Sequence, residues 1–439
     1  MTTPATGEFE SIVTAVPGPY SRNLAALLRT YEAPGVTYLG DDYPVFWASA
    51  SGATVTDVDG NRYLDLTSAF GVAATGHTNP HVVEAIAAQA QRLMHGMGDV
   101  HPTEVRTKLL LRLSELAPGD LTKTYLSTSG AEAIEFALKT ALLATGKPRT
   151  IAYHGAYHGL SLGALEVAGI EKFRTPFAPL VADRATFLPY PDATTSVESA
   201  IREVSEALDR DPDAGAVLLE PIQGRGGVIV PPDGFLRALR DLCYGRGVLL
   251  ILDEIYTGFG RTGTMFACER ERVVPDLLCV GKALGGGTPL SATIGSAAVM
   301  NAWPKSTGEA LHTSTFLGNP LACAAALANL DEIARLDVPA LVRAQEGALG
   351  DGLRRLRTLA NVSDVRGRGF LWAVEFDSAE FANRVVVRGL AAGIILLQSG
   401  PTGTSITIAP PPVIGANQLH RALEIFERTV RETAASAGI

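Results

Sequence analysis

The chain has 439 residues, of which 46% are hydrophobic and 19% are charged, and its net charge is −9. This composition allows a large buried core and excludes a disordered chain, and the length predicts more than one domain. The negative charge argues against binding to nucleic acid or to an anionic membrane surface. The four cysteines lack Cys-x-x-Cys spacing, and no basic segment followed by an apolar run opens the sequence. We therefore expect reduced cysteines and a soluble enzyme of the cytoplasm.

Both ends of the chain are expected to build one smaller domain. Residues 1–70 should form an arm and then a β-hairpin, because the turn residues Asp59-Gly60 separate two alternating segments. The hairpin has no partner strand nearby in the sequence, so we expect it to join the C-terminal residues 331–439. In that segment helices alternate with strands expected at 370–376, 393–397 and 405–408. The two segments together predict an α+β domain.

Within residues 71–330, the chain alternates helices with short apolar strands from about residue 100 onward. This alternation predicts a large α/β domain with a doubly wound, mostly parallel sheet. Three apolar strands end directly before polar residues: 216–219 before Glu220, 247–252 before Asp253, and 276–280 before Gly281-Lys282. Active groups in such sheets lie at the carboxyl ends of the strands. We therefore expect Glu220, Asp253 and Lys282 to lie close together.

Asp253 and Lys282 together suit the cofactor pyridoxal 5′-phosphate (PLP). A lysine amine can form a Schiff base with the aldehyde of PLP, and the glycines after Lys282 leave room around its amine. A carboxylate after so apolar a strand as 248–252 is costly without a cationic partner, and a protonated pyridine nitrogen would be one. The alternatives are a solvated surface lysine at 282, and an ion pair or a helix cap at 253.

Two further segments could hold parts of such a cofactor. Ser129-Gly130-Ala131 begins a predicted helix, whose first N–H groups form an anion site suited to a phosphate. Tyr157 and His158 follow a predicted strand, and an aromatic ring there could stack on a flat cofactor ring. No cluster of Asp, Glu, His or Cys accompanies His154 and His158, so we expect no metal site.

Eight segments of the chain resemble the class III aminotransferases of PLP fold type I, the group that contains the ornithine, 4-aminobutyrate and acetylornithine aminotransferases. They occur in the order of the family over roughly residues 45–415, and they are VTDVDGNRYLDLTSAFGVAATGHTNP, STSGAEA, YHGLSLG, LEPIQG, LDEIYTGFGRTG, PDLLCVGKALGGG, STFLGNPLACAAA and APPP. The resemblance implies that residues 71–330 bind PLP and that the enzyme is a homodimer.

The resemblance also implies roles for single residues. Lys282 and Asp253 are the implied catalytic residues, as the Schiff-base lysine and the partner of the pyridine nitrogen. Thr315 is implied to reach the phosphate bound by the neighbouring subunit. The other implied cofactor-binding residues are Ser129, Gly130, Ala131, Tyr157, His158, Glu220, Ile255 and Tyr256.

Three positions depart from the family pattern. Tyr256 stands where the relatives usually have a glutamine, Thr407 where they have an arginine that binds the substrate carboxylate, and Arg225 where two of them have a glutamate that pairs with that arginine. We hypothesise that Arg225 binds a substrate carboxylate instead, in a substrate site that also includes Phe70 and Thr407. The alternative is that Arg225 pairs with a local Asp or Glu.

The predicted activity is a PLP-dependent aminotransferase. It would move an amino group between an ω-amino acid, an amine or an amino acid and a keto acid or aldehyde. An amino-acid racemase or epimerase, or a decarboxylase on the same scaffold, stays open as an alternative. A non-catalytic relative that serves as a binding or structural protein is a further alternative.

Overall fold

The computed structural model describes residues 8–37, 40 and 43–436. The chain divides into two compact units. The large unit is Pro80–Val342, and the small unit combines the segment up to Asn79 with the segment from Arg343. The sequence alone predicts boundaries after residues 70 and 330. Residues 71–79 stay with the small unit because Gly52 and His77 exchange two backbone hydrogen bonds. Residues up to 342 stay with the large unit because helix α11 (Pro320–Leu336) packs on helix α3 (Pro80–Arg92).

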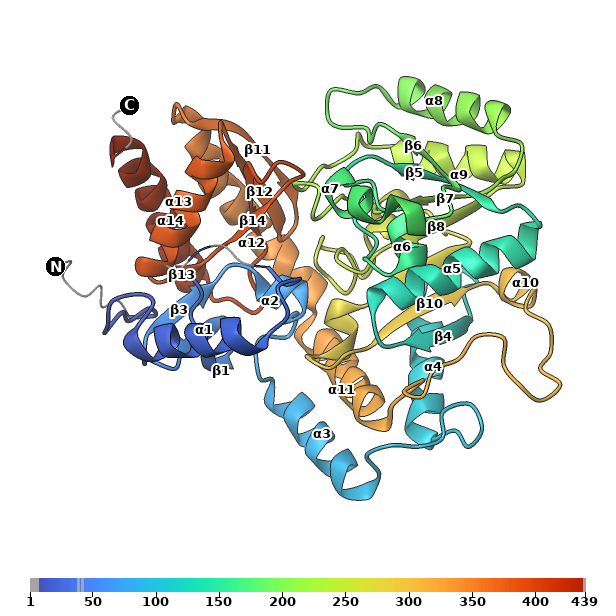
Figure 1. Ribbon diagram of the computed structural model, residues 1–439, viewed down its shortest axis with the longest axis horizontal. Coiled ribbons are helices and arrows are strands. Elements are labelled where there is room, and N and C mark those ends of the chain that lie inside the picture. Colours follow the sequence, from blue (N-terminus) through green and yellow to red (C-terminus); the bar gives the residue numbers. More distant parts are fainter. Residues whose placement is uncertain (1–7, 38–39, 41–42, 437–439) are drawn as a thin grey trace. The chain divides into compact units, whose positions relative to one another are not determined.

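The large unit contains a seven-stranded sheet in the order β4-β10-β9-β8-β7-β5-β6 (Figure 1). Its strands are β4 (Lys123–Ser127), β5 (Arg149–Tyr153), β6 (Ala185–Leu188), β7 (Ala214–Leu219), β8 (Leu249–Asp253), β9 (Leu277–Val280) and β10 (Ser291–Gly295). The pairs β6–β5, β5–β7, β7–β8 and β8–β9 are parallel, and β10 runs antiparallel to both of its neighbours. The predicted mostly parallel sheet is confirmed.

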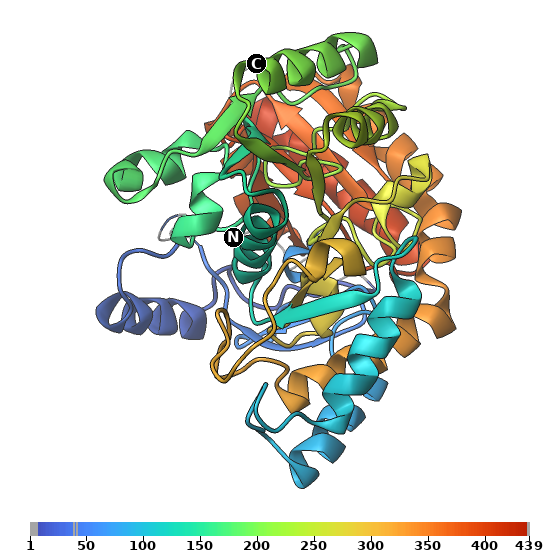
Figure 2. The ribbon, with the colours of Figure 1, turned by 90° about the vertical axis from the view of Figure 1, so that its right-hand side faces the viewer.

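Helices cover both faces of this sheet (Figures 1 and 2). Besides α3 and α11 the α-helices of the large unit are α4 (Glu104–Leu116), α5 (Gly130–Thr145), α6 (Leu162–Glu166), α7 (Glu171–Arg174), α8 (Val197–Arg210), α9 (Phe235–Arg246) and α10 (Ala297–Met300). The chain moves one way along the sheet through α5 and the other way through α8 and α9. Because such crossovers are right-handed, α5 lies on one face and α8 and α9 on the other, so the sheet is doubly wound.

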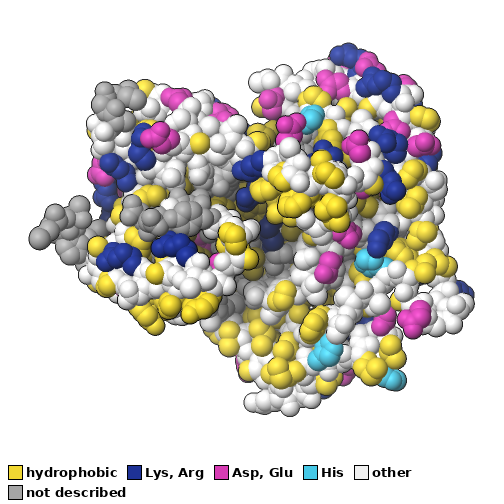
Figure 3. All heavy atoms as spheres, in the orientation of Figure 1, with side chains coloured by type: hydrophobic (Ala, Val, Ile, Leu, Met, Phe, Trp, Pro, Cys, Tyr) yellow, Lys and Arg dark blue, Asp and Glu magenta, His cyan; other side chains and the backbone are white. Residues whose placement is uncertain are grey.

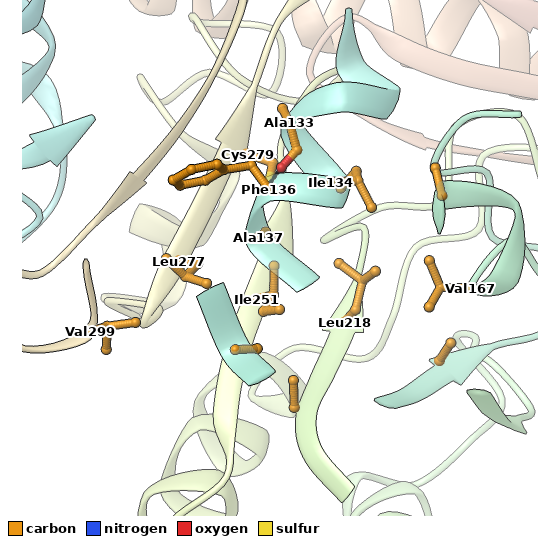
Figure 4. Close-up of a cluster of buried hydrophobic side chains, with 14 of the residues drawn as sticks. Ala133, Ile134, Phe136, Ala137, Val167, Leu218, Ile251, Leu277, Cys279 and Val299 are labelled. Carbon is orange, nitrogen blue, oxygen red and sulfur yellow. Dashed lines mark hydrogen bonds between the residues drawn. The ribbon is translucent and has the colours of Figure 1, made fainter. Parts of the chain in front are cut away.

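A buried apolar cluster joins α5 to the sheet (Figure 4). All residues of β7 are buried, as expected of a strand covered on both faces. The cluster combines α5 side chains with strand side chains, including Ala133, Ile134, Phe136, Ala137, Leu218, Ile251, Leu277 and Cys279. This packing fixes the start of α5 relative to the ends of β7, β8 and β9, where the expected site residues lie.

The small unit contains two four-stranded sheets, in the orders β1-β2-β3-β13 and β11-β12-β15-β14. Its strands are β1 (Trp47–Ser51), β2 (Thr54–Asp57), β3 (Arg62–Asp65), β11 (Val362–Arg368), β12 (Leu371–Phe376), β13 (Ile394–Ile395), β14 (Leu397–Ser399) and β15 (Ser405–Ile408). Its helices are α1 (Pro19–Tyr31), α2 (Ser68–Gly71), α13 (Ala379–Ala391) and α14 (Ala416–Ser436), and α12 (Val338–Arg354) runs across the boundary between the units. The hairpin strand β3 pairs in parallel with β13, so the two ends of the chain share a sheet.

Charged side chains of both signs are interspersed with apolar ones on the face shown in Figure 3. Among the described residues, no helix combines the length and the apolar character that crossing a bilayer requires. The described part of the chain also holds no group of three or more His, Cys, Asp or Glu side chains arranged to bind a metal ion.

Candidate active site

Polar side chains gather at the carboxyl ends of the parallel strands of the large unit. Asp253 is the last residue of β8, Glu220 directly follows β7, and Lys282 lies two residues after β9. His158 lies in the loop after β5, and its Nδ1 is 2.8 Å from Oδ2 of Asp253. The sheet thus brings together residues that are far apart in the sequence.

Asp253 and His158 form a buried pair. Asp253 is 4% exposed and His158 is 2% exposed. The other carboxylate oxygen of Asp253 accepts a hydrogen bond from the backbone N–H of Ile255 at 3.0 Å. Nε2 of His158 is buried and has no hydrogen-bond partner among the described residues. A buried carboxylate oriented in this way can hold a cationic N–H group.

The amine of Lys282 lies beside the ring of Tyr256. Its Nζ is 4.2 Å from the ring centroid, and the backbone of Lys282 has a φ of 44°. Burial lowers the pKa of the Lys282 amine, Asp253 and Glu220 oppose this effect, and Arg225 and Arg261 add to it. A lysine with a lowered pKa has a larger neutral fraction, and the neutral amine is the form that acts as nucleophile and base.

The start of α5 faces two close neighbours. The side chain of Ser129 caps the helix by accepting a hydrogen bond from the N–H of Glu132. A Cβ at Gly130 would lie 2.8 Å from the side chain of Ile255, and a Cβ at Gly159 would lie 2.5 Å from Cβ of Ala131. Small residues therefore allow both neighbouring loops to approach the first turn of the helix. The positive end of the helix dipole there favours an anion.

Glu220 is buried and connects two loops. Its Oε1 accepts the backbone N–H of Tyr157 at 3.0 Å, and its Oε2 accepts the backbone N–H of Gly224 at 2.9 Å. Burial raises the pKa of the Glu220 carboxyl to about 7, against the opposing effect of His158, and Asp253 raises it further. A carboxyl group with this pKa changes its charge in the physiological range.

Arg225 rests on two aromatic rings. Its guanidinium carbon is 5.2 Å from the ring centroid of Tyr157 and 5.4 Å from that of Phe173 in α7. Both distances are in the range of cation–π contacts. No Asp or Glu among the described residues forms an ion pair with Arg225. The alternative in which a local acid pairs with Arg225 is therefore not what the described residues show.

Sequence reasoning missed two residues of this group, Phe173 and Arg261. Phe173 lies in a four-residue helix, and no periodic pattern points to its contact with Arg225. Arg261 is 2% exposed and influences the pKa of Lys282. Its position in the glycine-rich segment GFGRTG, after the buried strand β8, is the sequence feature that could have identified it.

Three other predicted residues, Thr315, Phe70 and Thr407, are described by the unit to which each belongs. Thr315 belongs to the large unit and is exposed, next to Phe316. Phe70 belongs to the small unit, is 59% exposed, and has a φ of 63° in the turn Ser68–Gly71. Thr407 also belongs to the small unit, in the central strand β15, where its hydroxyl donates to Oγ of Ser399 at 2.7 Å.

The turn that carries Phe70 is strained and firmly held. Ser68 and Ala69 also have positive φ values, of 49° and 47°. The buried carboxylate of Asp65 accepts hydrogen bonds from the N–H and hydroxyl of Thr67 and from the N–H of Ala69. Strained segments of this kind cluster at ligand-binding sites.

Known proteins resemble this chain over most of its length. The family model for aminotransferase class-III matches residues 38–430. Acetylornithine aminotransferase of Methanopyrus kandleri is 40% identical over 385 residues, which cover 87% of this chain and 93% of that protein. 4-Aminobutyrate aminotransferase of Mycobacterium leprae is 37% identical and covers 95% of this chain and 97% of its own length.

A solved aminotransferase structure also resembles this chain. Ornithine aminotransferase from Toxoplasma gondii, which has PLP at partial occupancy in its active site, superposes with a TM-score of 0.86. It is 30% identical, and the match covers 95% of this chain and 96% of that one. With the family model and these relatives spanning most of its length, the chain belongs to the class III aminotransferase family and moves an amino group from an amino donor to a keto acid.

Proposed function

We propose that this aminotransferase uses PLP, bound in the large unit, and prefers amino donors that carry a carboxylate, which Arg225 binds. The observation that carries the substrate preference is the position of Arg225, whose guanidinium lies on the ring of Tyr157 and forms no ion pair with a described carboxylate. An arginine without an ion-pair partner can bind a carboxylate by donating two parallel hydrogen bonds to it. The names of two relatives, acetylornithine and 4-aminobutyrate aminotransferase, also refer to donors with a carboxylate.

The residues of the large unit fit PLP. The buried carboxylate of Asp253 would hold the protonated ring nitrogen, and the amides at the start of α5 would hold the phosphate. Tyr157 and Ile255 would lie against the two faces of the ring. When bound, PLP supplies an electron-withdrawing ring that stabilises negative charge on the donor carbon.

Lys282 would then act as the base and acid of the reaction. Its amine takes the proton from the amine-bearing carbon of the donor and later returns a proton. Burial lowers the pKa of this amine, which suits a base that works near neutral pH. Asp253 would keep the ring nitrogen of bound PLP protonated, and His158 holds the Asp253 carboxylate in place through its Nδ1.

We also propose a homodimer in which Thr315 contributes to the site of the neighbouring subunit. Two loops of the large unit contact each other, since Thr313 Oγ1 donates to Asp99 at 2.8 Å and the rings of His95 and Phe316 are 5.2 Å apart. These loops expose several large apolar side chains, namely Leu93, Met94, Met97, Val100, Leu311 and Phe316. Exposed apolar groups gathered in this way support an interface between proteins.

We also propose a cytoplasmic location, on the basis of the cysteines. Cys243, Cys268, Cys279 and Cys323 are all free and buried. Reduced thiols are typical of the cytosol, where disulfides rarely persist.

The test of the substrate preference compares two donors that differ only in the carboxylate, an ω-amino acid and the alkylamine of the same chain length. In Arg225→Ala, we expect kcat/KM for the ω-amino acid to fall at least about tenfold relative to the alkylamine, because a hydrogen bond to a charged group contributes about 1.5–3 kcal/mol. Arg202→Ala is the matched control, since Arg202 is an exposed arginine of α8. An equal fall for both donors in Arg225→Ala would sink the proposal.

A further inference from the structure

We propose that Glu220 is a positioning residue for substrate recognition: its carboxylate holds the loop of Tyr157 against the loop of Arg225 and thereby fixes the place of the guanidinium. This inference rests on the proposed binding of a substrate carboxylate by Arg225. It adds a residue that does not itself touch the substrate and that sets the donor preference by holding Arg225 in place.

The two loops meet at the carboxylate of Glu220. One oxygen accepts the N–H of Tyr157, in the loop after β5, and the other accepts the N–H of Gly224, in the loop after β7. Arg225 is the next residue along the chain, and its guanidinium returns to the face of the Tyr157 ring. Glu220 therefore holds both the backbone from which the arginine extends and the ring on which it rests.

Further contacts hold these two loops in place. Nε2 of Gln223 donates to the carbonyl of His154 at 2.8 Å. A Cβ at Gly226 would lie 2.7 Å from the carbonyl oxygen of Gly155, so only glycine fits there. The phenol of Tyr190 donates to the carbonyl of Glu220 at 2.8 Å. The loops are thus packed together, and the Glu220 carboxylate is the charged group at their junction.

An ionised carboxylate is the side chain that this junction requires. Both of its oxygens accept and neither donates, so it can satisfy two N–H groups at once. A glutamine of the same shape has one acceptor oxygen and would turn its amide N–H₂ toward the other backbone N–H. A buried carboxylate is costly even with two hydrogen bonds, and the raised pKa of Glu220 reflects that cost. A group kept at such a cost beside a cluster of charged residues is a candidate for a functional role.

Glu254 provides a matched control within the same unit. It is also fully buried, and its carboxylate also accepts two backbone N–H groups, those of Ala267 at 2.6 Å and Cys268 at 2.8 Å. It further accepts the hydroxyl of Thr257. These partners belong to a different segment from the loops of Tyr157 and Arg225. Glu254→Gln therefore reproduces the loss of a buried charge without disturbing the junction.

The experiment measures the ratio of kcat/KM for the ω-amino acid to kcat/KM for the alkylamine, in the enzyme loaded with PLP. This ratio does not depend on the fraction of folded enzyme. We expect Glu220→Gln to lower the ratio at least about fivefold, in the same direction as Arg225→Ala, and Glu254→Gln to leave it unchanged. In the double variant Glu220→Gln/Arg225→Ala the ratio should equal that of Arg225→Ala alone, because both changes act through one group.

A binding measurement gives a second readout that needs no turnover. Valerate carries the carboxylate without the amine, and isothermal titration gives its Kd for each variant. The Kd should rise at least about fivefold in Glu220→Gln and stay unchanged in Glu254→Gln. Glu220→Asp, which keeps two acceptor oxygens on a shorter side chain, should lie between wild type and Glu220→Gln and replaces it if the glutamine variant does not fold.

The outcomes separate this inference from the proposed function. If Arg225→Ala lowers the ratio but neither Glu220 variant does, the arginine site stands and the positioning role of Glu220 is wrong. If Glu220→Gln and Glu254→Gln change the two donors equally, Glu220 is only a structural acid. If Arg225→Ala leaves the ratio unchanged, both the arginine site and the inference are wrong.

Discussion

Lys282 lies among charges that act on its amine in opposite directions. Burial and the two arginines Arg225 and Arg261 lower the pKa of the amine, whereas Asp253 and Glu220 raise it. The net effect is a lowered pKa, which gives a lysine that can lose its proton more readily than one in water. This balance of charges is the chemical reason for assigning the role of base to Lys282.

The raised pKa of Glu220 leads to a prediction about how the donor preference depends on pH. Because burial raises this pKa to about 7, the carboxyl is protonated below pH 7 and ionised above it. Only the ionised form accepts both backbone N–H groups, so the preference for the ω-amino acid over the alkylamine should be high near pH 8 and should decrease as the pH falls through about 7. Kinetics with both donors at a series of pH values measure this. The charged neighbours of this site, His158, Asp253, Lys282 and Arg225, are the same for both donors.

Glu220→Gln is the control for this pH dependence. A glutamine does not titrate, so the ratio between the two donors should be low and flat across the series. Effects of Lys282 on both donors cancel in the ratio. A ratio in Glu220→Gln that still decreases below pH 7 would assign the titration to another group.

The sequence predicted the strand-end residues well and the surroundings of Arg225 poorly. Asp253 and Lys282 follow apolar strands, and the sheet brings their strand ends together as expected. Whether Arg225 would pair with an acid depended on contacts between distant parts of the chain, since its ring partner Tyr157 lies in another loop, 225 − 157 = 68 residues away. The nearest acid in the sequence, Glu220, already accepts two backbone N–H groups.

Elements with a strong periodic signal were predicted closely, and short polar strands were missed. A helix is predicted to begin at Ser129-Gly130-Ala131, and α5 spans Gly130–Thr145 with Ser129 as its cap, because the apolar face and the serine are both visible in the sequence. Strand β10 has the sequence SATIG, which lacks an apolar run, yet all five residues are buried between β4 and β9. It can be buried because the hydroxyl of Thr293 donates to the carbonyl of Ala133 in α5.

The exposed apolar side chains of the two loops that contain Met97 and Phe316 lead to a prediction about the oligomeric state. Met97 is 61% exposed in the loop that contacts the segment of Phe316. A charge at the centre of an apolar interface costs several kcal/mol when it is buried without a partner, so Met97→Lys should shift the enzyme from dimer toward monomer. Light scattering coupled to size-exclusion chromatography gives the mass in solution.

The matched control is Leu142→Lys. Leu142 is 41% exposed on α5, outside the two loops, so its variant should keep the mass of wild type. If Met97→Lys has the mass of a dimer at micromolar concentration and below, the interface does not involve this loop. If wild type itself is a monomer, the proposed contribution of Thr315 to a neighbouring site is wrong.

At the scale of the whole molecule, both ends of the chain belong to one unit. Ile12 of the N-terminal arm packs in one cluster with Val55 and Tyr63 of the hairpin and with Leu390 and Ile395. The buried carboxylate of Glu10 also accepts hydrogen bonds at 3.0 and 2.7 Å from Arg421 in α14. The sequence indicated a shared domain through the unpaired hairpin. It could not indicate the boundary, because residues 71–79 are held by two backbone hydrogen bonds that no side-chain pattern reveals.

The central claim is that PLP is bound at the strand ends through Lys282. Borohydride reduction of the PLP-loaded enzyme fixes the cofactor on the amine to which it is attached, and peptide mass mapping identifies that lysine. We predict that the added mass lies on Lys282 alone, and that Lys282→Ala carries no added mass and transfers no amino group, while Lys305→Ala behaves as wild type. Cofactor mass on another lysine, or amino transfer by Lys282→Ala at the rate of wild type, would contradict the account.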